Sequence, residues 1–297
     1  MATKDRRCRT RFVSWCRAGV FHGLIACALL TGGFGCRSKV DALPEDVRPS
    51  SGHRVAAKGH APVVGERAQV LGVYDGDTIR VDLEGVEEKV RVIGVDTPER
   101  PGRDHDGQEG YREATAFTKS FCAKGRTVLL QRDSFNKNRD KYERLLRHVR
   151  LLDGRDLARE LIREGLGFAF VRFPFEGSAE HLALEAVARQ AGRGVWAPQR
   201  IHEASWRDPM PHLWEVVRVR GRIVGTHQGQ KLSFLNFAEH YKDRLSLVVY
   251  AAANDQFPSE VCKLYEGRRV EVVGRMSVFR GQAQIAIGNP DQIQLLD

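Results

Sequence analysis

The stretch from Asp75 to Glu99 limits the possible folds of this chain more than any other part of the sequence. Two runs of alternating apolar residues, at 77–81 and 90–95, are joined by a tight polar turn at 84–85. Successive side chains of a strand point to opposite faces, so two such runs around a short turn predict a β-hairpin.

Acidic residues gather at both bends of this predicted hairpin. Asp75 and Asp77 flank a glycine before the first strand, and Asp96 and Glu99 flank a proline after the second. A hairpin that folds back can bring Asp77 and Asp96 together. Two close carboxylates repel each other unless they share a proton or a cation. A site with oxygen ligands alone suits a hard divalent ion such as calcium or magnesium.

Arg91 lies on the second strand of the hairpin, among apolar neighbours that favour partial burial of its side chain. An arginine beside an acidic metal site is well placed to bind a phosphate group that the metal also binds. The plainer alternative is a surface hairpin with an Asp-Gly turn and a structural ion pair. The combination of these residues at this spacing favours the phosphate site.

The same residues resemble the first signature of the thermonuclease (staphylococcal nuclease-like) family. That signature consists of Asp-Gly-Asp-Thr, here at 75–78, then an arginine, here Arg91, and Asp-x-Pro-Glu, here at 96–99. The resemblance extends over residues 65–198. It implies a β-rich α+β fold, with an OB-type five-stranded barrel and three helices, and a calcium-dependent phosphodiesterase activity.

A second stretch, Asp140-Lys141-Tyr142 followed by Arg144, resembles the second signature of that family. It differs from the family at Glu143, where glycine or glutamine is usual, and at Arg147, where a small residue is usual. An acid at Glu143 could pair with Arg144. The segment 140–149 alternates like a strand, so neighbouring side chains are expected to point to opposite faces and to avoid this pairing.

The resemblance implies the metal ligands Asp77, Asp96 and Thr97 (through its carbonyl) for one Ca²⁺ ion, and the catalytic residues Arg91, Glu99 and Arg144. The family also places a tyrosine near the nucleotide after its second helix, and residues 165–173 contain none. Lys141 and Tyr142 are therefore the candidate substrate-binding residues, with a packing role as the alternative for Tyr142. The two arginines would meet the charge that develops on the phosphate. Glu99 would act as a base or orient the attacking water. The implied substrates are DNA and RNA, with little sequence preference.

The pattern along the chain predicts two domains joined by a linker. The nuclease-like domain spans 64–198, with helices expected at Glu109–Ala123, Asp156–Glu164 and Ser178–Gln190. A proline-bearing linker is expected at 199–212. Residues 213–297 hold six predicted strands and one helix at 258–265, which is the pattern of a second small OB-like β-barrel.

The second predicted domain could bind nucleic acid or a protein, or serve only as a structural barrel. Candidate contacts to bases and phosphates come from its aromatic and basic residues. They are Phe234, Phe237 and Tyr250 for bases, and Arg218, Arg220 and Lys231 for phosphates. The alternative is that the arginines are solvated strand residues. No obligate protein partner is predicted.

The first 35 residues have the pattern of a signal peptide, with a basic start, an apolar run at 18–30 and small residues after it. Cys36 follows Gly-Phe-Gly and resembles the lipid-attachment cysteine of bacterial lipoproteins, although Gly33 departs from that pattern. Residues 36–63 are polar and lack periodicity, as in a flexible tether. The leader predicts export, either as a membrane-anchored lipoprotein or as a secreted or periplasmic protein.

Composition sets the remaining limits. Charged residues make up 29% and apolar residues 42% of the chain, as in a globular protein. Much of the net charge of +9 lies in the leader, so the rest is mildly basic and compatible with a polyanionic partner. Only Cys122 and Cys262 follow Cys36, which does not predict a disulfide framework.

These observations predict an exported calcium-dependent endonuclease that acts on DNA or RNA. The alternative is a non-catalytic lipoprotein that keeps the nuclease fold to bind nucleic acid or another anionic ligand. Loss of a metal carboxylate, an arginine or the final glutamate would favour that alternative, and this sequence retains all of them.

Overall fold

The computed structural model describes residues 65–102, 106–240 and 244–296, all of which belong to one compact unit. The predicted signal peptide at 1–35, the tether at 36–63 and the proposed lipidation site Cys36 lie outside the described residues. In the described ranges, every helix is too short or too polar to cross a membrane.

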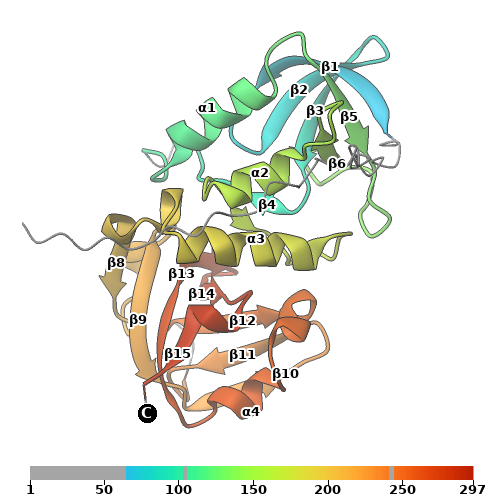
Figure 1. The fold of residues 1–297 in the computed structure, drawn as a ribbon. Coiled ribbons are helices and arrows are strands. Elements are labelled where there is room, and N and C mark those ends of the chain that lie inside the picture. The colour runs from blue at the N-terminus through green and yellow to red at the C-terminus, as the bar shows by residue number, and fades with distance from the viewer. Residues whose placement is uncertain (1–64, 103–105, 241–243, 297) are drawn as a thin grey trace, which may run out of the picture. The chain divides into compact units, whose positions relative to one another are not determined.

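The first sheet closes into a barrel of five strands in the order β1-β2-β3-β6-β5 (Figure 1). The strands are β1 (Glu66–Val73), β2 (Thr78–Leu83), β3 (Val86–Val92), β5 (Thr127–Gln131) and β6 (Leu145–Arg150). All neighbouring strands are antiparallel except β3 and β6, which are parallel. Their inward side chains, among them Val70, Ile79, Val81 and Leu130, are almost fully buried. The predicted OB-type barrel is therefore confirmed.

The predicted hairpin is formed by β2 and β3, with Thr78 opposite Arg91. Its two turn residues, Glu84 and Gly85, both have positive φ, at 55° and 85°. Such turns match the twist of the flanking strands. The Asp82 carboxylate accepts a hydrogen bond from the Gly85 N–H at 2.7 Å and stabilises the turn.

Three helices accompany the barrel, as predicted: α1 (Tyr111–Phe121), α2 (Leu157–Arg163) and α3 (Ser178–Gln190) (Figure 1). Asp156 caps α2 by accepting a hydrogen bond from the Arg159 N–H at 3.2 Å. Two short strands, β4 (Val95–Asp96) and β7 (Phe168–Ala169), pair antiparallel outside the barrel. This pairing holds Asp96 beside the segment that leads into α3.

The second sheet has eight strands, in the order β10-β11-β12-β14-β13-β9-β8, with β15 also paired to β13. The strands are β8 (Ile201–Ala204), β9 (Val216–Arg222), β10 (Gly225–Gln228), β11 (Leu232–Asn236), β12 (Ser246–Tyr250), β13 (Arg269–Phe279), β14 (Gln282–Ala286) and β15 (Ile293–Leu295). The one α-helix assigned within residues 213–240 and 244–296 is α4 (Val261–Tyr265). A strand-rich second sheet is confirmed. Its described strand pairings do not join β10 to β8, so they do not close it into a barrel.

Short one-turn helices connect several of these strands. They are η1 (Gly194–Trp196), η2 (Pro198–Arg200), η3 (Met210–His212), η4 (Ala251–Gln256) and η5 (Pro290–Gln292).

The strand boundaries differ from the predicted ones at two places. The segment predicted as a linker, 199–212, contains β8, which pairs parallel with β9. This four-residue edge strand is only partly buried, so its sequence lacks the alternation of apolar and polar residues that predicts a strand. The single strand predicted at 214–225 is divided into β9 and β10 around the buried Ile223. The division of the chain into the two predicted domains stays a prediction.

The core of the second sheet includes residues that precede it in the chain. Ile93, Phe175 and Leu182 pack with the buried side chains of β9–β14. A Cβ on Gly288 would lie 2.5 Å from Leu182 Cδ2, so glycine permits α3 to approach the sheet. Asn289 Nδ2 also donates a hydrogen bond to the Leu182 carbonyl at 3.1 Å. These contacts hold β13 near β4.

Candidate active site

Asp77 lies in the turn between β1 and β2 and is buried. Its Oδ2 atom accepts hydrogen bonds from the Thr97 N–H at 2.9 Å and the Thr97 hydroxyl at 3.1 Å. A Cβ on Gly76 would lie 2.6 Å from Thr97 Oγ1, so the close approach of these two loops requires glycine there. Thr118 of α1 donates a further hydrogen bond to the Gly76 carbonyl at 2.6 Å. The two ends of the hairpin are thus fastened together.

Arg91 lies between Asp77 and Asp96. Its Nε is 3.3 Å from Asp77 Oδ1, and its Nη2 is 2.9 Å from Asp96 Oδ1. Its Nη1 donates to the carbonyls of Val92 and Val95, both at 2.7 Å. Burial acts to lower the pKa of this guanidinium, but Asp77 and Asp96 raise it, so Arg91 stays charged. The structure therefore brings two of the three predicted metal ligands, Asp77 and Asp96, to one arginine.

Negative charge is in excess around this arginine. Burial and the nearby Asp77 and Glu99 raise the pKa of Asp75 to about 7. Burial, then Asp77 and Asp96, also raise the pKa of Glu99, although its side chain is partly exposed to solvent. The Glu99 N–H donates to Gln108 Oε1 at 3.1 Å, which fixes the loop that carries it.

Arg144, directly before β6, contacts the same group of residues. Its Nη1 donates to Thr78 Oγ1 at 3.3 Å, and the Thr78 hydroxyl donates to Asp77 Oδ1 at 3.1 Å. Its Nη2 is 2.8 Å from Asp140 Oδ2. The Arg144 guanidinium lies 5.6 Å from the centre of the exposed Tyr142 ring. Arg144 is thereby linked to Asp77 through one hydroxyl.

Glu143 has a φ of 62° and lies before β6, which begins at Leu145. The expectation of a strand over 140–144 is therefore wrong. The side chain of Arg144 nevertheless pairs with Asp140, which competes with any pairing to Glu143. A left-handed conformation at this position explains why glycine suits it.

The unusual Arg147 points into a buried position rather than towards the site. Only 1% of its side chain is exposed, and its Nε is 3.0 Å from Glu66 Oε2. Its Nη2 donates to Asn138 Oδ1 at 2.9 Å. Arg147 thus ties β6 to β1 and to the preceding loop.

A groove of about 640 Å³ opens beside the two arginines. The predicted substrate residues Lys141 and Tyr142 line it, together with Arg91, Arg144 and Phe170. The Lys141 ammonium lies 4.8 Å from the centre of the Tyr142 ring. The two arginines can bind a phosphate group, and the exposed ring of Tyr142 can stack on a base.

The predicted metal ligands offer oxygen atoms alone, from the carboxylates of Asp77 and Asp96 and the carbonyl of Thr97. This donor set fits a hard divalent cation in its chemistry. Among the described residues, however, no three His, Cys, Asp or Glu side chains are grouped so that they could hold a metal. Both Asp96 oxygens are paired with guanidinium groups, so cation binding would have to displace part of this pairing.

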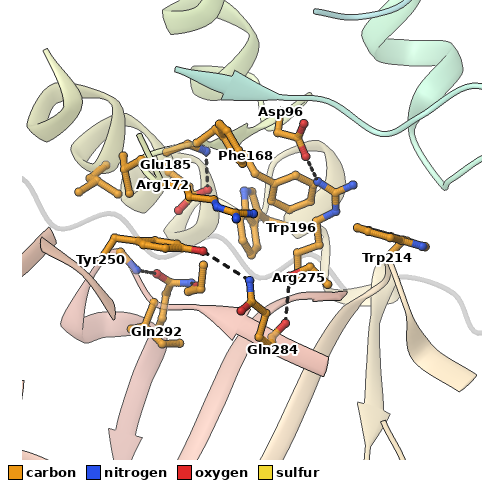
Figure 2. Close-up of a pocket in the computed structure, with 18 of the residues that line it drawn as sticks. Asp96, Phe168, Arg172, Glu185, Trp196, Trp214, Tyr250, Arg275, Gln284 and Gln292 are labelled. Carbon is orange, nitrogen blue, oxygen red and sulfur yellow. Dashed lines mark hydrogen bonds and ion pairs between the residues drawn. The ribbon is translucent and has the colours of Figure 1, made fainter. Parts of the chain in front are cut away.

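Arg275 of β13 is a residue of the site that the sequence analysis missed. Its Nη1 is 2.6 Å from Asp96 Oδ2 (Figure 2). Its Nη2 donates to Gln108 Oε1 at 2.6 Å. Its guanidinium carbon lies 4.6 Å from the centre of the Phe168 ring and 5.5 Å from that of Trp214. In the sequence, Arg275 is one of several arginines on predicted strands, and no motif or spacing distinguishes it as a residue of the site.

Two of the three predicted phosphate contacts of the second sheet, Arg218 and Arg220, are held in ion pairs, and the third, Lys231, is exposed. Arg218 and Arg220 both pair with Glu203 and Glu271, which neutralises much of their charge. Phe237 is buried and stacks on Trp206, so its face is not free for a base. Tyr250, in contrast, lines a pocket beside Asp96 and Arg275.

Residues 89–198 match the family model described as staphylococcal nuclease homologue. The chain is 34% identical over 131 residues to a thermonuclease of Staphylococcus hyicus, which covers 43% of this chain and 75% of that protein. It is 42% identical over 96 residues to a thermonuclease of Staphylococcus intermedius, and this match covers 32% of this chain and 55% of that protein. An uncharacterized endonuclease of Escherichia coli O157:H7 is 30% identical over 129 residues, which cover 43% of this chain and 76% of that protein. With its closed five-stranded barrel and both signatures, this chain belongs to the staphylococcal nuclease homologue family.

Proposed function

We propose that this protein is a nuclease that hydrolyses phosphodiester bonds in DNA or RNA. The observation that carries the proposal is the position of Arg91 between Asp77 and Asp96, with Arg144 joined to Asp77 through Thr78. The family, and relatives described as thermonucleases and an endonuclease, support the same activity.

The two arginines would stabilise the charge that develops on the phosphate in the transition state. Arg91 is held by carbonyl and carboxylate partners, so it is oriented before substrate binds. Arg144 is paired with Asp140, which fixes the guanidinium at the wall of the groove. Two oriented guanidinium groups at one groove suit a tetrahedral phosphate that passes into a five-coordinate state.

Glu99 is the carboxylate in this group that is partly open to solvent and is not ion-paired to Arg91. Its raised pKa makes it a better proton acceptor than an ordinary glutamate once it is ionised. We assign it the task of orienting or deprotonating the attacking water.

The proposed cofactor is one Ca²⁺ ion, which Asp77, Asp96 and the Thr97 carbonyl would hold. When bound, a divalent cation would neutralise part of the phosphate charge. The leader further supports export, either with a lipid anchor at Cys36 or as a free secreted or periplasmic protein.

The test is to assay the purified full chain on single-stranded DNA, duplex DNA and RNA, with calcium and with excess chelator. We expect hydrolysis that requires calcium. Glu99→Ala and Arg144→Ala should each lower kcat by about 100- to 1000-fold. Arg155→Ala, which removes an exposed ion pair with Asp153 on the surface, is the matched control.

Activity that survives chelation would refute the calcium requirement, and activity undiminished in both variants would refute the proposed residue roles. Oligonucleotide binding without any hydrolysis by the wild-type protein would instead support the non-catalytic alternative.

A further inference from the structure

A pocket of about 260 Å³ lies between the segment carrying Phe168 and Trp196 and strands β13 and β14 of the second sheet (Figure 2). Aromatic rings form much of its wall. Phe168 and Trp196 meet edge to face at 5.4 Å on one side, and Tyr250 lies on the other. Trp214, which is 40% exposed, lies at the rim beside Arg275. The volume of the pocket is smaller than that of most sites for drug-sized ligands, and it suits a single flat ring system.

The wall also carries polar groups that can read a planar heterocycle. Gln284 of β14 is buried, and its amide lies 3.4 Å from the Tyr250 hydroxyl. Within the described part of the chain, Trp196 Nε1 and Arg275 Nε are buried donors that lack a hydrogen-bond partner. A buried polar group without a partner is costly. Both atoms are covered by neighbouring protein atoms, so a ligand with acceptor atoms could pair with them only after a side chain at the wall has moved.

This pocket adjoins the candidate active site through shared side chains. Asp96 is part of its wall, and the same carboxylate pairs with Arg91 of the groove. Phe170 lines both the pocket and the groove. In a polynucleotide with one phosphate at Arg91, one nucleotide can therefore lie in the groove and the adjacent nucleotide in the pocket.

We propose that this pocket binds one unstacked nucleobase of a polynucleotide substrate, next to the nucleotide whose phosphate reacts. The proposal rests on the proposed nuclease function, and it assigns a substrate subsite to the second sheet. Aromatic rings hold bases by stacking, whatever the sequence. In a duplex the base must first leave its stack and its partner, so single strands should enter more readily.

The first test measures binding without hydrolysis. The full chain is titrated, in excess chelator, with a fluorescent single-stranded 12-mer and with a set of 12-mers that each carry one abasic site. Trp214→Ala and Tyr250→Ala should each weaken binding of the intact strand about tenfold. Trp214→Phe, which keeps a ring, should restore most of the affinity. Leu295→Ala, at an exposed site on β15, is the control.

The second test combines the Trp214→Ala substitution with an abasic site in the strand, to show whether the two changes remove the same contact. For the wild-type protein, an abasic site at one position of the strand should weaken binding about as much as Trp214→Ala does. In the Trp214→Ala protein, the same abasic site should cost little more. Equal losses from the abasic site in both proteins, or no loss at any position, would overturn the proposal. Circular dichroism of each variant shows whether it has folded.

The outcome also separates this inference from the nuclease activity itself. Hydrolysis by the wild-type protein without base-dependent binding at Trp214 would refute the pocket alone. Base-dependent binding without hydrolysis of any substrate would refute the proposed function and leave the pocket assigned.

Discussion

Arg275 Nη1 lies 2.6 Å from Asp96 Oδ2, although 179 residues separate them in the chain. The other oxygen of the same carboxylate pairs with Arg91 of β3. One aspartate thus joins an arginine of the barrel to an arginine of the second sheet. Since only 10% of the Arg275 side chain is exposed, solvent screens this interaction little.

Replacing Arg275 by alanine should strengthen Ca²⁺ binding at the proposed metal site. The substitution removes a positive charge that competes for Asp96, and one unit charge at about 4 Å contributes roughly 1 kcal/mol even at high dielectric constant, or about fivefold in Kd. Isothermal titration calorimetry of the two proteins with calcium checks this. Arg275→Lys keeps the charge and should resemble the wild type. Weaker calcium binding by Arg275→Ala would contradict the competition.

Replacing Arg91 by alanine should reduce both stability and activity. It leaves Asp77 and Asp96 without their shared partner, and breaking such a buried pair costs about 3–5 kcal/mol. Urea unfolding and kcat/KM on single-stranded DNA measure the two effects. Arg91→Lys keeps the charge but loses the fork of donors, so activity should stay low.

The control for Arg91 is Arg80→Ala on the adjacent strand. Arg80 pairs with Glu87 on the surface, with roughly half of each side chain exposed. Its loss should change the free energy of unfolding by less than about 1 kcal/mol. A cost for Arg91→Ala as small as that for Arg80→Ala would show that Asp77 needs no cation beside it.

Local sequence signals predicted the parts of the site that lie within one hairpin. Alternating residues and a two-residue turn set the register of β2 and β3, and this register places Thr78, next to Asp77, opposite Arg91. Asp96 follows β3 by four residues and pairs with the same arginine. Helix α3 was predicted at its observed bounds because its apolar residues recur at helical spacing.

Contacts between distant segments left no such signal. Arg275 is one of several arginines on an alternating strand, and its contact with Asp96 joins segments far apart in the chain. The turn at Glu143 was also missed, because glutamate rarely adopts positive φ and its sequence context alternates like a strand. The parallel strand β8 depends wholly on its partner β9.

The backbone at Glu143 leads to a stabilising substitution. Its φ of 62° costs a residue with a Cβ roughly 1–2 kcal/mol, whereas glycine has no such cost but loses more entropy on folding. Glu143→Gly should therefore raise the free energy of unfolding by about 0.5–1 kcal/mol. Urea unfolding measures it. Glu143→Ala keeps the strain and should show no gain. A gain for alanine equal to that for glycine would assign the effect to charge instead.

Glu185 of α3 is buried at the edge of the pocket. Its Oε1 accepts a hydrogen bond from the Ala169 N–H at 2.9 Å, and Arg189 Nη1 lies 3.7 Å from its Oε2. Asp291 pairs with the same arginine and competes for its charge. Burial raises the pKa of Glu185 above its ordinary value of 4.5. Arg189 and the Ala169 N–H offset this only in part, and Asp291 adds to it.

Glu185→Gln should therefore stabilise the protein increasingly as the pH rises. A raised pKa in the folded state means that folding favours the protonated carboxyl, so its contribution is complete below pH 4.5 and is lost as the pH passes the folded-state pKa. Glutamine keeps the acceptor for the Ala169 N–H and carries no charge at any pH. Urea unfolding of both proteins from pH 4 to pH 8 should show nearly equal free energies at the acidic end. The difference should then grow in favour of glutamine, by at most about 1.4 kcal/mol per pH unit. Glu180→Gln, at an exposed position of the same helix, is the control. A difference that stays constant or shrinks with rising pH would show that Arg189 fully compensates the buried charge.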